Sequence, residues 1–539
     1  MFHKITCRFV PRASLVCLIG SIVAANALAT VYYVSPSGSD KKAGTSPALA
    51  WKTITRVNKG RYSPGDRILF QGSSSFSGTL TFTRGGTPSA PIVVSSYGSG
   101  RATVKSAGRA LFAYNVAGFR IANINFSGGG RTSNTGEGIM FYNDLPNNTK
   151  LPYIDIQGVD VSGFGKDGIC IGAWNGKSGY SDIRILNVDT HDNAVSGINI
   201  WGTSTTAPGW SHFTVYIAFT RAFNNSGISG YSRHTGDGIV VGDADVVVVE
   251  RSVAFNNGWL STTHDGPVGI WAYDVNRALI QYNESYGNRS AGAADGGGFD
   301  LDGGAQNSVM QYNYSHDNDG PGFLLCWYSG ARPSMNNVLR YNVSHNDARK
   351  NGVGAIHLWG AQTNSAIYHN TVDVSKPVSG LPKALWVQSG VTNLSVRNNI
   401  FIARSGLTSI QVAGGQSNAL FQNNSYWAAG SPIQMSWNST LYSGLSAWRA
   451  ATGQEKVNGI DAGFEVDPGL SGPALPVTLG DASLLSTLSA YRLNTTSPLV
   501  DRGLNLTGFG IASGPFDFYG NASTLGLAPD LGASEAGPY

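Results

Sequence analysis

Charged residues are scarce in this sequence: they make up 13% of 539 residues, about half the usual share. Such a shortage of lysine and glutamate argues against a helical bundle or a coiled coil. The 41% of hydrophobic and 11% of aromatic residues are too many for a disordered chain. Glycine is abundant, with 70 residues, but no Gly-X-Y period occurs, which excludes collagen. A large β protein rich in turns remains, long enough to bury a sizeable core.

Long hydrophobic runs are absent too, apart from one short stretch near the N-terminus. Residues 14–25 are largely apolar, follow the cations Lys4, Arg8 and Arg12, and precede an Ala-x-Ala sequence at 27–29. This order is typical of a secretory signal peptide, here residues 1–29. The apolar stretch is too short to span a bilayer. We therefore expect a secreted protein, extracellular or periplasmic, without a membrane span.

The net charge is small once this leader is set aside. The leader holds three cations and no acidic residue, so 34 cationic residues face 33 acidic ones, a net charge of +1. Such a chain has no broad basic surface for nucleic acid or for an anionic membrane. We expect neither as a partner, and we expect a monomer.

An asparagine that follows a short β run recurs along the chain. Its contexts are QYNES, QYNYS, RYNVS, YHNTV and RNNIF, at spacings of 30, 29, 28 and 29 residues. The members are Asn283, Asn313, Asn342, Asn370 and Asn399, with Asn224 and Asn256 continuing the series backwards and Asn424 forwards. A fixed period of this kind indicates a repeat architecture. We expect the asparagines to stack as a ladder whose side-chain amides bond from coil to coil.

A second series consists of a small residue, an apolar residue and then alternation. It comprises Gly138-Ile139, Gly168-Ile169, Gly197-Ile198, Gly238-Ile239, Gly269-Ile270, Gly298-Phe299, Gly322-Phe323, Ala355-Ile356 and Ala384-Leu385. Short β runs broken by Gly and Asn indicate strands and tight turns. Several strands per repeat without an intervening helix predict a solenoid of β coils. Cys170 and Cys326 fall on coils several turns apart, so we expect no disulfide between them.

These repeats resemble the right-handed parallel β-helix, or pectate-lyase-like, superfamily of secreted polysaccharide-active enzymes. The opening VYYVSPSGSDKKAGTSPALAWKTI and PGDRILFQG, and the tail segments LSAWRAATGQE, YRLNTTSPLVDRG, DFYGN and PDLGASE, carry the same resemblance. It implies an all-β, single-stranded right-handed solenoid with capped ends, and leaves the reaction open. We expect an N-terminal cap over 30–100 with a helix at 51–59, coils over 101–430, and an irregular C-terminal cap over 431–539 with a helix at 445–452.

Strand alternation sorts the second series into inward and outward columns. The expected inward stack is Ile239, Ile270, Phe299, Phe323, Ile356 and Leu385. The next positions face outward: Val240, Trp271, Asp300, Leu324, His357 and Trp386. Two residues further on lie Gly242, Tyr273, Asp302, Cys326, Trp359 and Gln388. This alignment brings acidic and aromatic side chains together on one exposed sheet.

Asp300 and Asp302, in GGGFDLDGG, are the candidate catalytic acids. Carboxylates at i and i+2 share one face of a strand, with Cβ atoms roughly 6.5–7 Å apart. Their oxygens could span the interval of roughly 6.5–9.5 Å that an inverting glycosidase uses. Mutual repulsion raises one pKa and makes that group a proton donor. The alternatives are a Ca²⁺ site that includes Asp295, or turn carboxylates that bond backbone amides.

Aromatic residues near this pair are candidate sugar contacts, since indole and phenol rings pack on the C–H faces of sugars. They are Trp201, Trp271, Tyr273, Trp359 and Trp386. The alternative is that these rings pack beneath long loops.

Two histidine-containing features complete the candidate site. His357 could orient a carboxylate or donate to a glycosidic oxygen. His264 and Asp265 sit where a loop could lean over the groove. By contrast, we expect Asp167 and Asp237, at turns that enter strands, to bond local backbone amides. The pairs His191-Asp192, His316-Asp317 and His345-Asn346 recur at corresponding turns and are expected to be structural.

Three functions fit these residues. The leading hypothesis is an endo-acting, inverting glycoside hydrolase that needs no cofactor and degrades a polysaccharide. The second is a Ca²⁺-dependent lyase on a uronate-containing glycan, with Arg349, Lys350 or Arg289 as base, although no Lys or Arg occupies the two outward columns. The third is a non-catalytic carbohydrate-binding scaffold.

Overall fold

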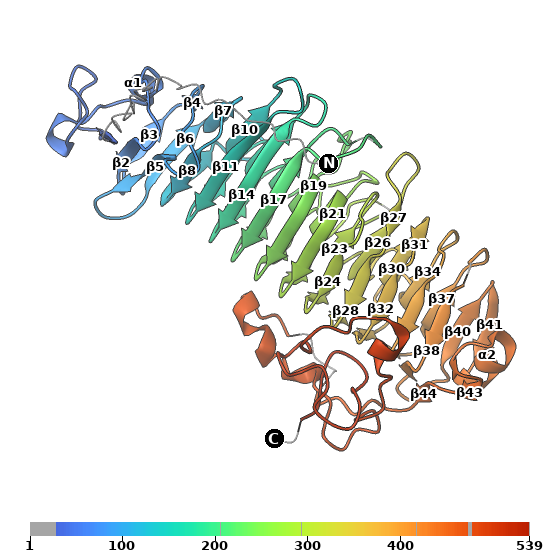
Figure 1. The fold of residues 1–539 in the computed structure, drawn as a ribbon. Coiled ribbons are helices and arrows are strands. Elements are labelled where there is room, and N and C mark those ends of the chain that lie inside the picture. The colour runs from blue at the N-terminus through green and yellow to red at the C-terminus, as the bar shows by residue number, and fades with distance from the viewer. Residues whose placement is uncertain (1–28, 205, 293, 417, 473–476, 538–539) are drawn as a thin grey trace, which may run out of the picture.

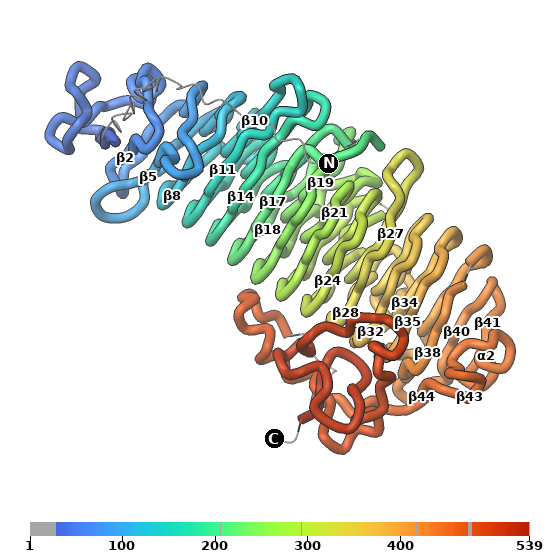
Figure 2. The backbone as a smooth tube through the Cα atoms, viewed as in Figure 1, coloured from blue at the N-terminus to red at the C-terminus, as the bar shows by residue number. Residues whose placement is uncertain are grey.

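The computed structural model describes residues 29–204, 206–292, 294–416, 418–472 and 477–537. Its coils stack side by side into an elongated rod, and successive strands run across it like rungs (Figures 1 and 2). The predicted β-helix is confirmed: nearly every strand pairs in parallel with the strand one coil away. The predicted signal peptide lies outside the described residues, save Ala29. No helix in the described ranges is long and apolar enough to cross a membrane.

Strands stack on three faces of the rod. The first face carries the pocket described below and is called the pocket face. Its strands are β4 (Leu80–Phe82), β7 (Leu111–Tyr114), β10 (Ile139–Asn143), β13 (Ile169–Ala173), β16 (Ser196–Trp201), β19 (Asp237–Glu250), β21 (Val268–Gln281), β23 (Gly297–Leu301), β26 (Phe323–Cys326), β30 (Gly354–Trp359), β34 (Lys383–Val387), β37 (Thr408–Val412) and β40 (Gln434–Trp437).

The second face is joined to the pocket face by β19 and β21, which run without a break through both. Its strands are β1 (Val31–Val34), β2 (Arg67–Gln71), β5 (Ile92–Tyr97), β8 (Phe119–Ala122), β11 (Lys150–Gln157), β14 (Gly179–Leu186), β17 (His212–Ala218), β24 (Val309–Gln311), β28 (Val338–Arg340), β32 (Ala366–Tyr368), β35 (Ser395–Arg397) and β38 (Leu420–Gln422).

The third face is a separate sheet of 14 strands. It consists of β3 (Ser75–Ser77), β6 (Ala102–Ser106), β9 (Ile124–Gly128), β12 (Asp160–Ser162), β15 (Asp189–His191), β18 (Arg221–Phe223), β20 (Val253–Phe255), β22 (Glu284–Tyr286), β25 (Tyr314–His316), β29 (Val343–His345), β33 (Thr371–Val374), β36 (Ile400–Ala403), β39 (Ser425–Trp427) and β44 (Phe464–Glu465).

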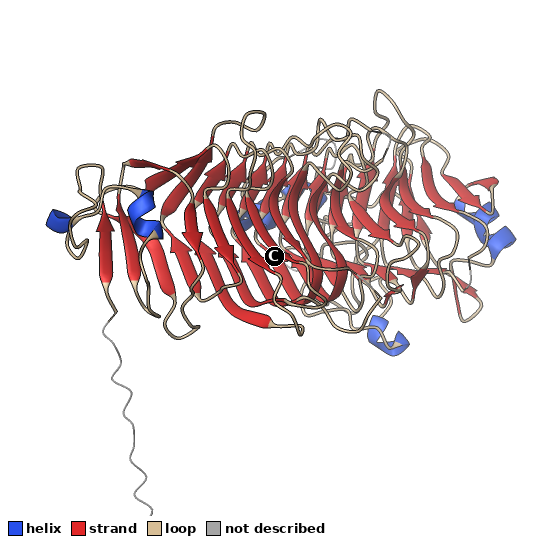
Figure 3. Cartoon of the chain, turned by 90° about the horizontal axis from the view of Figure 1, so that it is seen from above, coloured by secondary structure: helices blue, strands red, loops and turns tan. Residues whose placement is uncertain are grey.

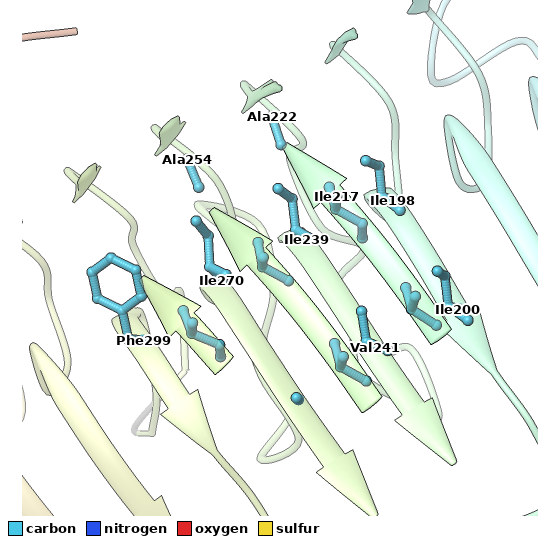
Figure 4. Packing of buried hydrophobic residues seen from close by; sticks show 14 of the residues in the cluster. Ile198, Ile200, Ile217, Ala222, Ile239, Val241, Ala254, Ile270 and Phe299 are labelled. Carbon is cyan, nitrogen blue, oxygen red and sulfur yellow. The ribbon is translucent and has the colours of Figure 1, made fainter. Parts of the chain in front are cut away.

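The expected inward stack forms the core. Ile239, Ile270, Phe299, Phe323, Ile356 and Leu385 pair in register from coil to coil and are all buried. Figure 4 shows Ile198, Ile239, Ile270 and Phe299 following one another inside the rod. Phe299 and Phe323 stack with ring centroids 5.2 Å apart. Burying one such side chain stabilises the fold by about 1.5–3 kcal/mol, so the stack contributes a large share of the stability of the rod. Cys170 and Cys326 are free, as expected.

The asparagine ladder is confirmed and buried. Side-chain amides link Asn283, Asn313, Asn342, Asn370, Asn399 and Asn424 in turn, at 2.9–3.1 Å, and the last donates to Glu455 at 2.8 Å.

Asn224 and Asn256, however, do not continue this ladder. They occupy positive-φ turn positions, and their neighbours Asn225 and Asn257 belong to a second ladder, which runs on through Asn288 to Asn318. The sequence alignment placed these two asparagines at the wrong corner of the coil. AFNN follows the short strand on the third face whereas QYN precedes such a strand, and the two segments look alike in sequence.

The paired histidines are structural, as expected. His191, Phe223, Phe255, Tyr286 and His316 stack on the third face with ring centroids 4.6–5.0 Å apart. His345 hydrogen-bonds the hydroxyl of Tyr491 instead.

The two ends of the rod differ from the expected caps. Helix α1 (Ile54–Asn58) covers only the middle of the predicted 51–59 segment, whereas α2 (Leu445–Thr452) has the predicted bounds. Parallel pairing already begins at β1, β2 and β5, inside the segment 30–100.

Only part of the segment 431–539 closes the far end. The hairpin of β40 with β41 (Thr440–Ser443) and α2 do so, but the chain from about 466 turns back along the flank of the rod (Figures 1 and 3). There Glu284 accepts the backbone amides of Leu479 and Gly480 at 2.8 and 2.7 Å, and Thr371 accepts that of Ala533. The apolar residues of this segment, such as Leu488 and Leu499, are buried against the third face. The sequence prediction of a cap missed this because the segment has little regular structure.

Candidate functional site

A pocket of about 1350 Å³ runs along the pocket face. Its lining extends from Phe112 and Tyr114 on β7 to Trp359 on β30, and includes loop residues that follow or precede these strands. Since coils rise by about 4.8 Å, the lined stretch is roughly 40 Å long. A groove of this length accommodates several consecutive sugar rings.

One outward column of side chains forms the floor of this pocket. Pairing places Tyr114, Tyr142 and Gly172 in register, then Gly172 with Trp201, Gly242 with Tyr273, and Cys326 with Trp359. The residues that follow the paired Ile200 and Val241 are Trp201 and Gly242, and those that follow the paired Ala272 and Leu301 are Tyr273 and Asp302, so these belong to the same column. The outward orientation predicted for Tyr273, Asp302 and Trp359 is confirmed, and the column extends further toward the N-terminus than predicted.

Glycines in this column make room for aromatic rings. A methyl group at Gly172 would come within 2.4 Å of Cζ2 of Trp201, and one at Gly242 within 2.1 Å of Cζ of Tyr273. Each ring therefore lies back across the glycine of the preceding coil. The Trp201 indole is also fixed at its edge, because Nε1 donates to Sγ of Cys170 at 3.2 Å.

Three carboxyl groups meet at the C-terminal part of the pocket: Asp295, Asp300 and Asp302. Asp300 is only 3% exposed, and its Oδ1 has no hydrogen-bond partner. Burial, followed by the charges of Asp302 and Asp295, raises the pKa of Asp300 well above its usual range. Burial also raises the pKa of Asp295 to about 7, although the amide of Gly266 donates to Oδ2 at 2.8 Å. Both groups are thus poised to carry a proton near neutral pH.

Asp302 has more donors than its neighbours. The backbone amide of Gly303 donates to Oδ1 at 2.6 Å, and the Cys326 thiol donates to the same carboxyl group. Burial, together with the charge of Asp265, raises the pKa of Asp302 above its usual range, although these two donors and the nearby His234 partly offset the increase. Among the three acids, Asp302 has the surroundings that best stabilise a carboxylate.

A histidine that the sequence analysis did not select faces this group. His234 lines the pocket, and its Nδ1 lies 2.8 Å from Oδ2 of Asp237, a residue with no exposed surface. Burial lowers the pKa of His234, but the bond to Asp237 and the charges of Asp237, Asp167 and Asp265 outweigh it, so the pKa is raised.

Asp237 holds the wall of the pocket together. Its Oδ1 accepts from the Val268 amide at 3.1 Å and from Nε1 of Trp271 at 3.0 Å. The expectation of a local turn amide is wrong here, because the backbone amide that Asp237 bonds is that of Val268, one coil further on. Trp271 is nearly buried by this bond and by the edge of His234, at 5.2 Å between ring centroids.

The N-terminal half of the pocket carries a second polar group. Glu137 pairs with Nε of Arg109 at 2.5 Å and with Nζ of Lys166 at 3.4 Å. Asp167 lies beside them and accepts from Asn199 at 3.3 Å, while its Oδ1 has no partner. Burial and the charge of Glu137 raise the pKa of Asp167 to about 7. Asp167 thus lines the pocket. The prediction that its carboxyl group bonds local turn amides is wrong, because the carboxyl group accepts from the side chain of Asn199 instead.

The structure brings most of the predicted site residues together. Those that line the pocket are Asp295, Asp300, Asp302, Trp201, Trp271, Tyr273, Trp359, His264 and Asp265. Trp359 is 42% exposed and so available to a ligand.

Three predicted site residues, His357, Trp386 and Arg349, are not among the described residues that line the pocket. The rings of His357 and Trp386 stack with centroids 4.7 Å apart, and Nε2 of His357 hydrogen-bonds the side-chain amide of Gln388. The imidazole is thereby buried, and this burial lowers the pKa of His357 to about 3. Arg349 follows β29 on the third face. The outward register of His357 and Trp386 was right, but beyond Trp359 outward side chains cover each other.

Several pocket residues were missed by the sequence analysis. Tyr142 could have been found by continuing the outward column of Tyr273 toward the N-terminus. It lies three residues after the inward Ile139, just as Tyr273 lies three residues after Ile270. His234 and Tyr328 lie on loops, where no period applies. Among the described residues, no three His, Cys, Asp or Glu side chains are arranged to hold a metal ion, so the donor geometry offers no support for a Ca²⁺ site at Asp295, Asp300 and Asp302.

Comparisons with known proteins agree with the fold. No protein-family model matches the chain. A lacto-N-biosidase of Bifidobacterium longum is 24% identical over 94% of this chain, which spans 36% of that protein's length. The crystal structure of the GH136 lacto-N-biosidase from Eubacterium ramulus superposes with a TM-score of 0.50 at 18% identity, covering 71% of this chain and 68% of that one. The chain has the parallel β-helix fold. Pectate lyase Pel9A is also similar, at 16% identity and a TM-score of 0.42, covering 94% of this chain and 96% of that one.

Proposed function

We propose that this protein is a glycoside hydrolase that cleaves a glycan bound along the pocket, with Asp302 and Asp295 as its reacting carboxyl groups. One observation carries the proposal: two accessible carboxyl groups with different donor sets lie together in an aromatic-lined groove. Glycosidases need this difference, because one acid must hold a proton while the other is ionised. The similarity to lacto-N-biosidases supports the reaction class.

Asp302 acts as the carboxylate. Its two donors and the neighbouring His234 favour the ionised form. In the inverting scheme favoured by the sequence, Asp302 takes a proton from the water molecule that attacks the anomeric carbon. Direct attack by Asp302 would instead retain the configuration, and proton NMR of the first product anomer distinguishes the two schemes.

Asp295 is a better proton donor than Asp300. Both hold protons near neutral pH, but Asp295 is half-buried whereas Asp300 is 3% exposed. A pKa of about 7 also lies close to the optimum for a general acid at neutral pH. Asp295 gives its proton to the glycosidic oxygen as the C–O bond breaks. Asp300 stays neutral beneath the pair, which revises the pairing drawn from the sequence alone.

Cleavage within a chain fits the position of these acids. Asp295 lies just before β23 and Asp302 directly after it, while the lining continues toward β7 on one side and to β30 on the other. Sugar rings can therefore occupy the groove on both sides of the cleaved bond, as an endo-acting enzyme requires.

The lyase alternative lacks its candidate bases next to the acids. Arg349, Lys350 and Arg289, the bases considered above, are not among the described lining residues. Of the Lys and Arg residues that do line the pocket, Arg109 and Lys166 are paired with Glu137 in the other half, and the third is Arg233, next to His234 in the chain.

Product mass tests the proposal directly. The full chain is incubated with neutral and uronate-containing oligosaccharides, with and without chelator, in normal and in ¹⁸O-labelled water. Hydrolysis gives fragments that together equal the substrate plus one water, with label at the new reducing end. Unsaturated fragments without added water would instead establish a lyase, and binding without fragments would establish a scaffold.

We also propose that the protein is exported, on the strength of the leader-like residues 1–29. Mass spectrometry of the N-terminus of protein recovered from the medium or periplasm tests this: a mature chain that starts at Thr30 supports export, and an intact leader in the cytoplasm overturns it.

A further inference from the structure

The N-terminal half of the pocket holds a group of aromatic rings far from the proposed reacting acids, Asp295 and Asp302. Tyr114 and Tyr142 stack at 6.2 Å, Tyr142 lies 6.0 Å from Trp201, and Trp174 meets Trp201 edge to face at 6.4 Å. All four line the pocket, and we call them the distal aromatic group. Trp174 is 58% exposed and Tyr114 is 39% exposed. A contiguous patch of exposed rings with polar groups at its edge is typical of a ligand-binding groove.

The group is held in place rather than loosely exposed. The hydroxyl of Tyr114 donates to Asp144 at 2.9 Å, and the amide of Asn115 donates to the same carboxylate at 2.7 Å. The Trp201 indole is fixed by its bond to Cys170 and by its position across Gly172. A ring that is fixed before binding loses little conformational entropy when a ligand stacks on it.

The distance to the carboxyl centre sets the length of the ligand. Trp201 lies three coils before Asp302 in the same column, roughly 14 Å away, and Tyr142 lies five coils before it, roughly 24 Å. One sugar unit of an extended chain advances by about the rise of one coil. A glycan cleaved at Asp302 reaches Trp201 with its third or fourth unit and Tyr142 with its fifth.

The charges near the group indicate a neutral ligand. Three cations, Arg109, Lys166 and Arg233, line the pocket together with the acidic residues Glu137, Asp144 and Asp167. Arg109 and Lys166 both pair with Glu137. The cations and the acidic residues are equal in number, so this half of the pocket has no excess of positive charge to attract a uronate. Hydroxyl-bearing neutral sugars match a floor of rings with polar groups at its edge.

We propose that the distal aromatic group is a binding subsite for neutral sugar units three to five positions away from the cleaved bond. This rests on the proposed function for the position of cleavage, and it makes the preferred substrate a neutral glycan of at least five units. The subsite contributes to affinity and leaves the bond-breaking step untouched.

Calorimetric titration of the full chain tests the subsite without turnover. The parent protein carries Asp302→Asn, and the probes are neutral oligosaccharides from disaccharide to octasaccharide, of lacto-N, xylan and β-glucan types, with oligogalacturonates of equal length for comparison. In the parent, we expect affinity for the recognised neutral series to rise up to about the pentasaccharide. Trp201→Ala removes the rise, with a loss of about tenfold for long ligands and little change for short ones.

A glycine variant checks that the ring itself is responsible. Gly172→Ala leaves Trp201 present but displaces it, and is expected to weaken long ligands as Trp201→Ala does. In the double variant Gly172→Ala/Trp201→Ala the added methyl group has no indole to displace. Gly172→Ala should therefore cause no further loss of affinity beyond that of Trp201→Ala. Trp427→Ala, a tryptophan on the third face, is the matched control and leaves binding unchanged.

The results separate this inference from the proposed function. Fragments produced at the same rate from short and long glycans, with Trp201→Ala neutral, would overturn the subsite and leave the hydrolase standing. Binding that depends on Trp201 without any fragments would keep the subsite and end the hydrolase. Equal or tighter binding of oligogalacturonates, or binding of no neutral series at all, would overturn the neutral-glycan assignment.

Discussion

The Nδ1 atom of His234 lies 2.8 Å from Oδ2 of Asp237, and Asp237 has no exposed surface. This buried carboxylate holds the imidazole in one orientation and favours its cationic form. The cation in turn lowers the pKa of Asp302. The pair therefore acts at a distance on the proposed catalytic carboxylate, as a positioning and electrostatic device.

The first prediction follows from that coupling. His234→Gln removes the positive charge, so the pKa of Asp302 rises and the acidic limb of the kcat/KM profile moves to higher pH by up to about one unit. Asp237→Asn moves the limb in the same direction, because an amide no longer stabilises the imidazolium. A purely structural role would lower kcat/KM at every pH and leave the limb in place, which would contradict the coupling.

The second prediction concerns the three acids. Asp295→Asn and Asp302→Asn should each lower kcat by about 10²–10⁴-fold. Asp300→Asn should cost less than about tenfold, because Asp300 is already neutral and the amide has the same shape. An aryl glycoside, whose leaving group needs no proton, should restore activity to Asp295→Asn but not to Asp302→Asn. Loss of activity in Asp300→Asn as large as in Asp302→Asn would return the proton donor to Asp300.

A third prediction is the shape of the pH profile. Activity requires Asp295 protonated and Asp302 ionised, so kcat/KM should be bell-shaped. The alkaline limb should fall near pH 7, the pKa of Asp295, since the donor is lost as pH rises through that value. Initial rates in buffers of constant ionic strength measure it. In Asp295→Asn the residual activity should lack that limb, and an unchanged limb would exclude Asp295 as its source.

The sequence predicted the rod and the floor of the pocket for one physical reason. Inside a coil, strand alternation is strict and neighbouring coils stack in register, so Ile270 and Phe299 determine where Trp271 and Asp300 point. The same rule reaches Tyr142 and Trp201, which form part of the distal aromatic group.

The rule fails where contacts are not periodic. Asp295 and His234 lie on segments that precede strands, and their roles depend on loop paths that no repeat specifies. His357 points outward as predicted, yet Trp386 covers it. The segment after 466 packs along the flank through scattered contacts such as Glu284 with Leu479. Burial of these groups depends on tertiary packing rather than on register.

The fourth prediction concerns the asparagine ladder. Asn342 accepts from the side chain of Asn313 at 3.1 Å and donates to the Met310 carbonyl at 2.9 Å and to Asn370 at 3.0 Å. Asn342→Ala leaves these buried groups unpaired and should destabilise the protein by about 2–4 kcal/mol. Asn336 bonds its neighbours in an exposed ladder at a positive φ, so Asn336→Gly should cost only a few tenths of a kcal/mol. Urea unfolding of both variants measures the difference, and equal losses would contradict the role of burial.

The fifth prediction is a pH-dependent stability at the end of that ladder. Glu455 is buried and accepts from Asn424 at 2.8 Å and from the Tyr426 hydroxyl at 2.7 Å, and burial raises its pKa from 4.5 to about 6. Between these values the folded protein binds more protons than the unfolded chain, so the free energy of unfolding falls as pH rises. The full effect is about 2 kcal/mol, complete above the folded pKa.

Glu455→Gln cannot ionise and should lose this part of the pH dependence. Its advantage over the parent should therefore be larger at pH 7 than at pH 4.5, while all other carboxyl groups contribute equally to both proteins. Urea midpoints measured at the two pH values give the difference directly. A gap between variant and parent that does not change with pH would mean that Glu455 is ionised to the same extent in the folded and unfolded chains, and that the donors of Asn424 and Tyr426 fully offset its burial.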